Sequence, residues 1–191
     1  MALSTIDTVP ALVVIDLQEG IAPAGSPFDP VVERSARLAE TFRRHGLPVI
    51  LVNVNGVAPG RSETSRIRPG TALPDGFADL VDELGAQPGD LRVTKRRRSA
   101  FHDTGLDTLL RDHKVTQVVL TGVATGSGVE STARSAVDHG YHVVLATDAM
   151  DDPDAVIHEH SVRRVFPKLG ETATTDEIID MVEATLAEAA R

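Results

Sequence analysis

Short apolar runs alternate along the chain with longer segments in which apolar residues recur at helical spacing. The runs are rich in Val, Ile and Leu, which predicts buried strands at residues 9–16, 48–54, 91–94, 118–120 and 143–145. Helices are predicted at residues 31–45, 105–114, 129–139, 153–166 and 176–190. This alternation predicts an α/β fold: a doubly wound, mostly parallel sheet with helices on both faces, in a Rossmann-like three-layer sandwich. The length of 191 residues predicts a single domain, 1–191.

The central unit of this pattern is residues 118–148, in which a strand, a glycine-rich turn, a helix and a second strand follow one another. The turn, residues 122–128, opens the helix at the carboxyl end of a strand, where open α/β sheets bind their ligands. The first N–H groups of a helix have no partner within the helix. The turn is therefore predicted to form a cradle for an oxyanion or a carboxylate.

Polar or small residues end the predicted strands, and the carboxyl ends of parallel strands meet at one edge of a sheet. These residues are Asp16, Asn53, Lys95, Gly122 and Asp148. The site is expected at that edge, with Asp16 near Lys95. A neighbouring cation favours the ionised carboxylate, whereas burial opposes it. By position alone, Asp16 is as readily explained as a turn or helix-capping residue.

Several motifs occur in an order that resembles the isochorismatase-like hydrolases, or cysteine hydrolase superfamily. They are the strand ending in Asp16-Leu17-Gln18, the segment from Lys95 to Ser99-Ala100-Phe101, and Gly122-Val123-Ala124-Thr125-Gly126-Ser127-Gly128-Val129. The resemblance implies an isochorismatase-like fold, Asp16 as the catalytic acid or base, Lys95 as its assistant, and Gly128 at the nucleophile position. It also implies a homo-oligomer and a non-proline cis peptide between Val123 and Ala124. Substrate or oxyanion contacts are expected from Val123, Ala124, Thr125, Ser127, Gln18 and Phe101.

The chain departs from this family in one decisive respect, since it contains no cysteine. The thiolate chemistry of the family therefore cannot operate here. The first of three interpretations is a hydrolase without a protein nucleophile that uses Asp16 as acid or base on a vinyl ether or C–N bond of a small anionic molecule. The second makes Ser127 a nucleophile. The third is a non-catalytic protein that binds a small molecule with the anion cradle retained.

No metal or cofactor is expected. Where the resemblance to metal-binding members implies an Asp-x-His pair, the chain has Asn53-Val54-Asn55, and neutral amides are poor ligands for transition metals. The glycine-rich turn lacks the third glycine of a dinucleotide fingerprint and the lysine of a phosphate-binding loop. His158 and His160 lie two apart on a predicted helix and are interpreted as surface residues.

Basic residues concentrate in two places, in a chain whose net charge is −9. They are Arg61, Arg66 and Arg68 in the loop 55–76, and Arg92, Lys95, Arg96, Arg97 and Arg98 farther along. Such a concentration fits an anionic ligand, acidic partners or an ordinary solvated charge run.

Composition narrows the possible partners. The negative charge and an aromatic content of 3% argue against nucleic-acid binding and against anionic membranes. No apolar run approaches the roughly 20 residues that span a bilayer. A chain without cysteine and without a signal-like N-terminus is expected in the cytoplasm, acting on a small-molecule substrate.

Overall fold

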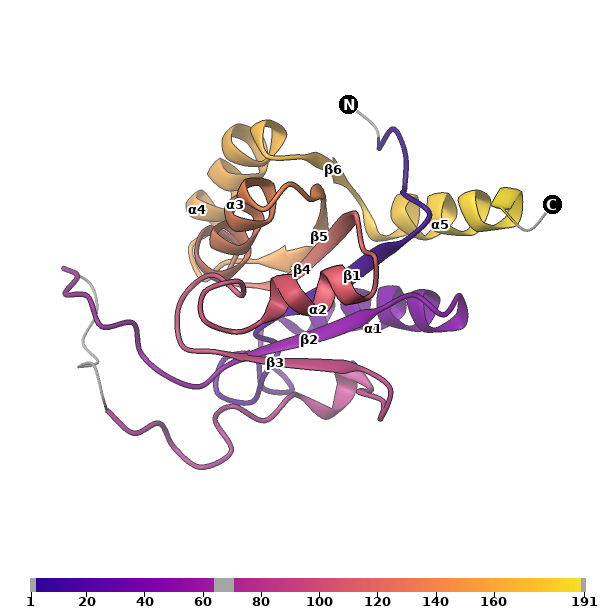
Figure 1. Cartoon of the computed structure of the whole chain (residues 1–191). Helices are drawn as coiled ribbons and strands as arrows, with labels where there is room; N and C mark the ends of the chain where they lie inside the picture. The colour runs from indigo at the N-terminus through magenta and orange to yellow at the C-terminus, as the bar shows by residue number, and fades with distance from the viewer. Residues whose placement is uncertain (1–2, 64–70, 190–191) are drawn as a thin grey trace.

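One six-stranded sheet organises the computed structural model, which describes residues 3–63 and 71–189. The strands lie in the order β3-β2-β1-β4-β5-β6, and every neighbouring pair is parallel (Figure 1). Their bounds are β1 Pro10–Ile15, β2 Val49–Val54, β3 Leu91–Lys95, β4 Gln117–Val123, β5 His142–Asp151 and β6 Glu171–Ala173. The predicted doubly wound α/β fold is confirmed. The strand order reverses between β1 and β4, which is where such sheets bind ligands.

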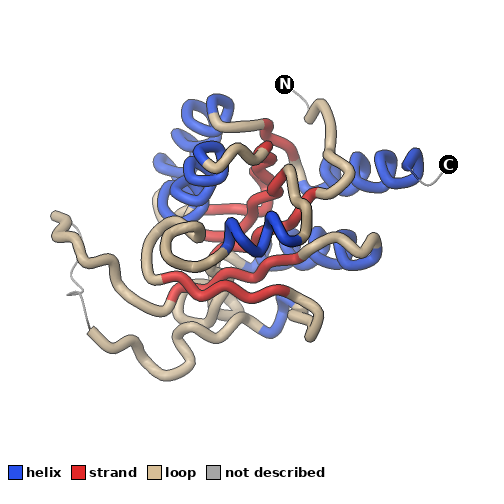
Figure 2. The backbone as a smooth tube through the Cα atoms, viewed as in Figure 1, coloured by secondary structure: helices blue, strands red, loops and turns tan. Residues whose placement is uncertain are grey.

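Helices cover both faces of the sheet (Figure 2). The α-helices are α1 Asp29–Arg44, α2 Leu106–Asp112, α3 Glu130–Asp138, α4 Ala155–His160 and α5 Thr175–Ala189. Shorter turns of helix are η1 Asp82–Leu84, η2 Thr125–Val129, η3 Ser161–Val165 and η4 Phe166–Lys168, of which η2 and η3 are π-helical. The helices α1 and α5 share one hydrophobic core cluster, whereas α2 and α3 belong to the other.

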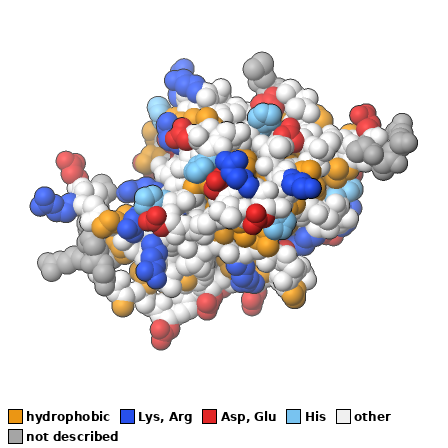
Figure 3. All heavy atoms as spheres, viewed as in Figure 1, with side chains coloured by type: hydrophobic (Ala, Val, Ile, Leu, Met, Phe, Trp, Pro, Cys, Tyr) orange, Lys and Arg blue, Asp and Glu red, His pale blue; other side chains and the backbone are white. Residues whose placement is uncertain are grey.

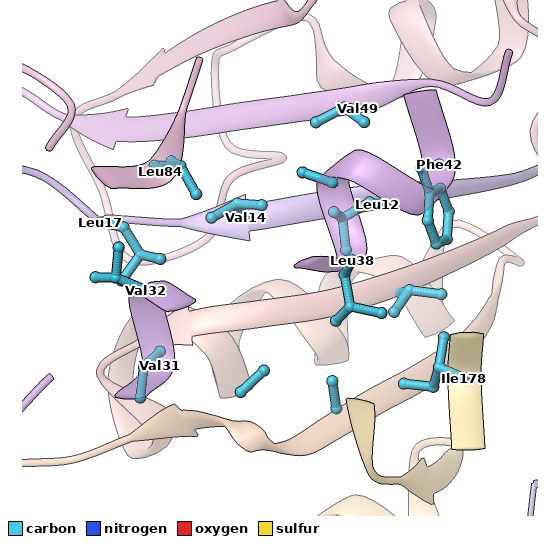
Figure 4. Packing of buried hydrophobic residues seen from close by; sticks show 14 of the residues in the cluster. Leu12, Val14, Leu17, Val31, Val32, Leu38, Phe42, Val49, Leu84 and Ile178 are labelled. Atoms are coloured by element: carbon cyan, nitrogen blue, oxygen red, sulfur yellow. The ribbon is translucent and has the colours of Figure 1, made fainter. Parts of the chain in front are cut away.

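Strand β1 shows how one short run supports both cores. Leu12 and Val14 point to the cluster formed with α1 and α5, which also holds Phe42 and Ile178 (Figure 4). Ala11, Val13 and Ile15 point to the opposite cluster. Because successive side chains of a strand alternate between faces, a strand that is apolar throughout must be covered on both sides. All six residues of β1 are buried.

The segment 153–166 differs from the single amphipathic helix that its pattern predicts. We expected Ala155, Val156, Val162 and Phe166 to face inward. Phe166 is buried and Val162 is partly buried, but Ala155 is exposed and Val156 is 74% exposed. The π turn η3 separates α4 from η4, and the extra residue in a π turn rotates the helix face. The expected inward positions therefore lose their common face.

Asp148 contacts the start of α5 and not the other residues that end the predicted strands. Strand β5 continues to Asp151, and its pairing with β4 shifts register between Leu120 and Gly122. The Asp148 carboxylate accepts hydrogen bonds from the backbone N–H and the hydroxyl of Thr175, at 2.7 and 2.9 Å, where α5 begins. Its other oxygen lies 3.4 Å from Nε of Arg34. Asp148 thus joins α1 to α5 and is a structural residue.

The visible surface carries interspersed acidic and basic side chains, without a large area of one sign (Figure 3). Within residues 3–63 and 71–189, none of the helices combines the length and the apolar character that crossing a bilayer requires.

Candidate active site

A buried ion pair lies at the carboxyl edge of the sheet. Asp16 follows the last residue of β1, and its backbone N–H donates to the carbonyl of Val52 in β2. Lys95 ends β3 and reaches past β2, so that its Nζ lies 2.7 Å from Asp16 Oδ2. The two side chains are only 7% and 3% exposed. The pair predicted from the strand ends therefore forms.

The backbone of Asp16 is itself unusual, with φ of 54°. A residue other than glycine rarely adopts this left-handed conformation, although aspartate tolerates it better than most. The chain therefore leaves β1 in a direction that an ordinary strand would not take. Such departures cluster at functional sites, where the surrounding structure holds them in place.

Burial dominates the electrostatics of Asp16. It raises the pKa of the carboxyl group to about 6, although the charge and the hydrogen bond of Lys95 act in the opposite direction. Asp16 Oδ1 has no hydrogen-bond partner among the described residues. With a pKa near 6, roughly one molecule in ten is protonated at pH 7. The group can both give and take a proton near neutral pH, which suits general acid–base catalysis.

Gly128 faces this carboxylate from the turn after β4. A Cβ placed on Gly128 would lie 3.2 Å from Asp16 Oδ2 and 3.1 Å from Cγ2 of Ile15. Any side chain at this position would thus point at the acid. Here the position carries only hydrogen, so no side chain stands between this part of the turn and Asp16.

The turn leading to Gly128 contains the cis peptide bond between Val123 and Ala124 that the resemblance implied. The N–H groups of this turn were predicted to bind an anionic ligand, but two of them donate to acceptors within the protein. The N–H of Gly126 donates to Oδ2 of Asp152 at 2.9 Å, and that of Ser127 donates to the carbonyl of Ala124 at 3.0 Å. The predicted anion cradle is therefore wrong at these two groups, because a carboxylate of the chain itself accepts one of the bonds.

Thr125 also faces the interior. It is fully buried, and its hydroxyl lies 2.9 Å from Nδ1 of His158 in α4. The same Nδ1 is 3.9 Å from Oδ1 of Asp151. His158 is consequently not the free surface histidine that we expected, but a contact between α4 and the turn. The two residues are 33 positions apart, and no local pattern signals their contact.

A cavity of ≈ 420 Å³ opens above the ion pair. Six predicted site residues line it: Asp16, Lys95, Val123, Ala124, Ser127 and Gly128. Its apolar wall carries no sequence motif that predicts it and includes Ile21, Val54, Val57, Leu73 and Phe77. Four arginines complete the lining: Arg61, Arg96, Arg97 and Arg98. Hollows of ≈ 480 and ≈ 590 Å³ lie elsewhere, but neither includes Asp16 or Lys95. Arg66 and Arg68 fall outside the described residues.

Gln18 and Phe101 stand outside the cavity lining, which corrects their expected contact with substrate. The Gln18 amide donates to the carbonyls of Val54 and Phe77, and its oxygen accepts from the N–H of Val54. Gln18 therefore ties the end of β2 to the segment that carries Phe77. Phe101 stacks on His139 with ring centroids 4.9 Å apart. Their roles are to support the walls and the packing.

Asn53 and Asn55 stand where the resemblance implied the Asp-x-His pair of metal-binding members, and the structure gives Asn53 a structural contact. Nδ2 of Asn53 donates to the carbonyl of Ala78 at 2.6 Å, so this amide anchors a loop. Within the described ranges, no group of three or more His, Asp or Glu side chains is arranged to hold a metal ion.

Known proteins are similar to this chain over most of its length. Residues 10–177 match the family model described as the isochorismatase domain. The isochorismatase family protein YwoC of Bacillus subtilis is 39% identical over 178 residues, covering 91% of this chain and 94% of YwoC. A solved isochorismatase family protein from Burkholderia thailandensis superposes with a TM-score of 0.88 at 36% identity, covering 94% and 98% of the two chains. The ureidoacrylate amidohydrolase RutB of Stutzerimonas stutzeri is 34% identical, covering 73% of this chain and 68% of RutB.

Proposed function

Since the chain belongs to the isochorismatase family of hydrolases, we propose that it hydrolyses a small molecule without a protein nucleophile, using Asp16 as acid or base. The observation that carries this proposal is the position of Asp16. Its carboxylate lies at the floor of the cavity, its pKa is raised to about 6, and the neighbouring position is Gly128. The chain contains no cysteine that could attack a substrate there.

With Asp16 protonated, the site is suited to a vinyl ether. The carboxylic acid gives its proton to the terminal carbon of the double bond, which leaves a positive charge shared by the other carbon and the ether oxygen. Water then adds through its oxygen to that carbon and returns a proton to Asp16. The resulting hemiketal breaks into a ketone and an alcohol. Lys95 limits the rise in the Asp16 pKa, so that the proton can leave near neutral pH.

With Asp16 ionised, the same site is suited to a C–N bond. The carboxylate takes a proton from water while the water oxygen attacks the carbonyl carbon. The C–N bond then breaks, and the leaving nitrogen takes the proton back from Asp16. The similarity to an amidohydrolase, RutB, supports this bond class as the second candidate. Both routes use water directly, and both need the carboxyl group of Asp16.

The test measures pyruvate release from isochorismate and product release from a panel of amides that includes ureidoacrylate. We expect turnover of at least one substrate, and a loss of about 100-fold or more in Asp16→Asn, because general acid–base catalysis contributes about 10²–10⁴-fold. Asp103→Asn is the matched control, since Asp103 is exposed and shares the left-handed backbone, with φ of 56°. Thermal melts check that each variant is folded.

Two outcomes would replace the proposal. If Ser127→Ala abolished turnover while Asp16→Asn did not, Ser127 would be the nucleophile. If small molecules from the panel bound in the cavity and none was hydrolysed, the chain would be a binding protein.

Other expectations stay predictions. These are the absence of a metal and of a cofactor, a homo-oligomeric state and a cytoplasmic location. Light scattering on the purified protein measures the oligomeric state, and metal analysis of active protein measures bound ions.

A further inference from the structure

The arginines around the cavity lack the acidic partners that most of the other described arginines have. Arg34, Arg37, Arg43, Arg44, Arg111, Arg134 and Arg163 each form an ion pair with a carboxylate. Among the described residues, Arg61, Arg96, Arg97 and Arg98 form none, although the chain has 28 acidic residues. Residues 64–70 contribute no acidic side chain that might pair with them. Four arginines without an ion pair therefore gather at this cavity, whereas Arg92 and Arg164, the other described arginines without one, lie apart from it.

These arginines occupy the rim of the cavity, not its floor. Arg61, Arg96 and Arg98 are exposed, whereas Asp16, Lys95 and Gly128 are buried. In Figure 3, basic side chains, with some acidic ones among them, stand on the side where residues 55–63 leave the body of the protein. The rim is also joined to the floor, because Nζ of Lys95 donates to the backbone carbonyl of Arg97 at 3.2 Å.

One side of the cavity between rim and floor is apolar. Val57, Leu73 and Phe77 contribute to it. The Phe77 ring packs so closely on Gly20 that a Cβ there would lie 2.1 Å from Cδ2 of the ring. This contact fixes the ring in place. An apolar wall of this kind favours a hydrocarbon body over a bare inorganic ion.

The carboxylate of Asp16 at the floor and the guanidinium groups at the rim determine the orientation of an anionic ligand in the cavity. A second anion beside the carboxylate of Asp16 would be repelled, whereas guanidinium groups bind carboxylate oxygens well. An anionic group therefore belongs at the rim, an apolar body on the wall, and a reacting bond at the floor.

Resting on the proposed function, we infer that the substrate is a small organic acid with a carboxylate at one end and its hydrolysed bond at the other. Arg61, Arg96 and Arg98 recognise the carboxylate. Arg97 contributes its carbonyl to Lys95 and helps to fix the rim.

The test measures binding without turnover, using benzoate, its neutral counterpart benzamide, and inorganic phosphate. Isothermal titration calorimetry on the full chain at low salt gives the three dissociation constants. We expect benzoate to bind about tenfold or more tightly than benzamide, because hydrogen bonds between two charged groups are stronger than those to a neutral group. Added salt should weaken benzoate binding and leave benzamide unchanged. Phosphate should bind more weakly than benzoate, because it leaves the apolar wall empty.

Single arginine substitutions test which side chains bind the carboxylate of benzoate. We expect Arg61→Gln, Arg96→Gln and Arg98→Gln each to weaken benzoate binding about 3–10-fold, since exposed charges are partly screened. Arg92→Gln is the matched control: Arg92 is exposed and has no ion pair among the described residues, but it lies outside this cavity. Its effect should be less than about twofold.

Three results would overturn the inference: equal binding of benzoate and benzamide, an equal loss in Arg92→Gln, or no binding of any carboxylate in a series from acetate to cyclohexanecarboxylate. Failure of the proposed function is distinguishable from these. If carboxylates bound but no substrate were hydrolysed, the inferred carboxylate site would stand and the proposed hydrolase function would be wrong. If neutral amides were hydrolysed but carboxylates did not bind, the hydrolase function would stand and the inferred carboxylate site would be wrong.

Discussion

Two opposing effects set the pKa of the Asp16 carboxyl group. Burial favours the neutral acid, and Lys95 at 2.7 Å favours the ion. Because burial is the larger effect, the pKa lies near 6, and small changes in pH alter the protonation state strongly. The same residue can therefore serve two reactions that require opposite protonation states.

The pH dependence of kcat/KM reveals which reaction operates, because it reports the ionisation of the free enzyme. For a vinyl ether the active form is protonated Asp16, so kcat/KM should be level below about pH 6 and fall about tenfold per pH unit above it. For a C–N bond the active form is ionised Asp16, so kcat/KM should rise to about pH 6 and then level off. A profile without any inflection between pH 5 and pH 7, measured with a substrate that does not itself titrate there, would contradict a role for Asp16 in proton transfer.

At the scale of elements, the turn after β4 is supported by the segment that leads into α4. Asp152 accepts the N–H of Gly126, His158 contacts the hydroxyl of Thr125, and Ile157 packs on Gly126. The helix α4 has no buried residue of its own. Its position is thus set largely by the same turn that presents Gly128 to Asp16.

The contact between Gly126 and Ile157 can be tested by substitution. A Cβ on Gly126 would lie 2.1 Å from Cγ2 of Ile157, so in Gly126→Ala either the Ile157 side chain or α4 must shift. We expect it to lower the free energy of unfolding by about 1–3 kcal/mol, the usual cost of overpacking. Ile157→Ala alone should cost little because Ile157 is half exposed, and the double variant should recover most of the loss. Additive losses in the urea-induced unfolding of the three variants would show that the two residues do not interact.

Much of this fold follows from sequence periodicity, because buried strands and amphipathic helices have patterns that a few residues reveal. The ends of β1 and β3 likewise predict that Asp16 and Lys95 meet. The contacts of Gly126 with Asp152 and of Thr125 with His158 were not predictable, since they join residues 26 and 33 positions apart. Strand β6 is only three residues long and partly exposed, so it carries no apolar run. The π turn before Phe166 changes the helical face without a residue type that marks it.

At the scale of the whole molecule, one sheet is stabilised by two separate cores. Phe42 of α1 belongs to one cluster, and Phe166 of η4 belongs to the other. Both side chains are fully buried. Strands such as β1 contribute to both clusters through alternate residues, so neither core is independent of the other.

This sharing predicts a single unfolding transition. We expect Phe42→Ala and Phe166→Ala each to lower the free energy of unfolding by about 3–5 kcal/mol and to shift the same transition. Val156→Ala is the control and should change stability by less than about 0.5 kcal/mol, because Val156 is 74% exposed. Calorimetry or circular dichroism measures the transition. Two separate transitions, each moved by only one of the variants, would show that residues 1–191 do not unfold as one domain.

The glycine that faces Asp16 has a consequence for inhibition. Enzymes that attack with a thiolate are silenced by hydrogen peroxide and by iodoacetamide, because both reagents modify the sulfur. This chain has no sulfur at that position and no cysteine elsewhere. The proposed chemistry of Asp16 and water would therefore continue in an oxidising environment, where an enzyme that relies on a thiol would stop.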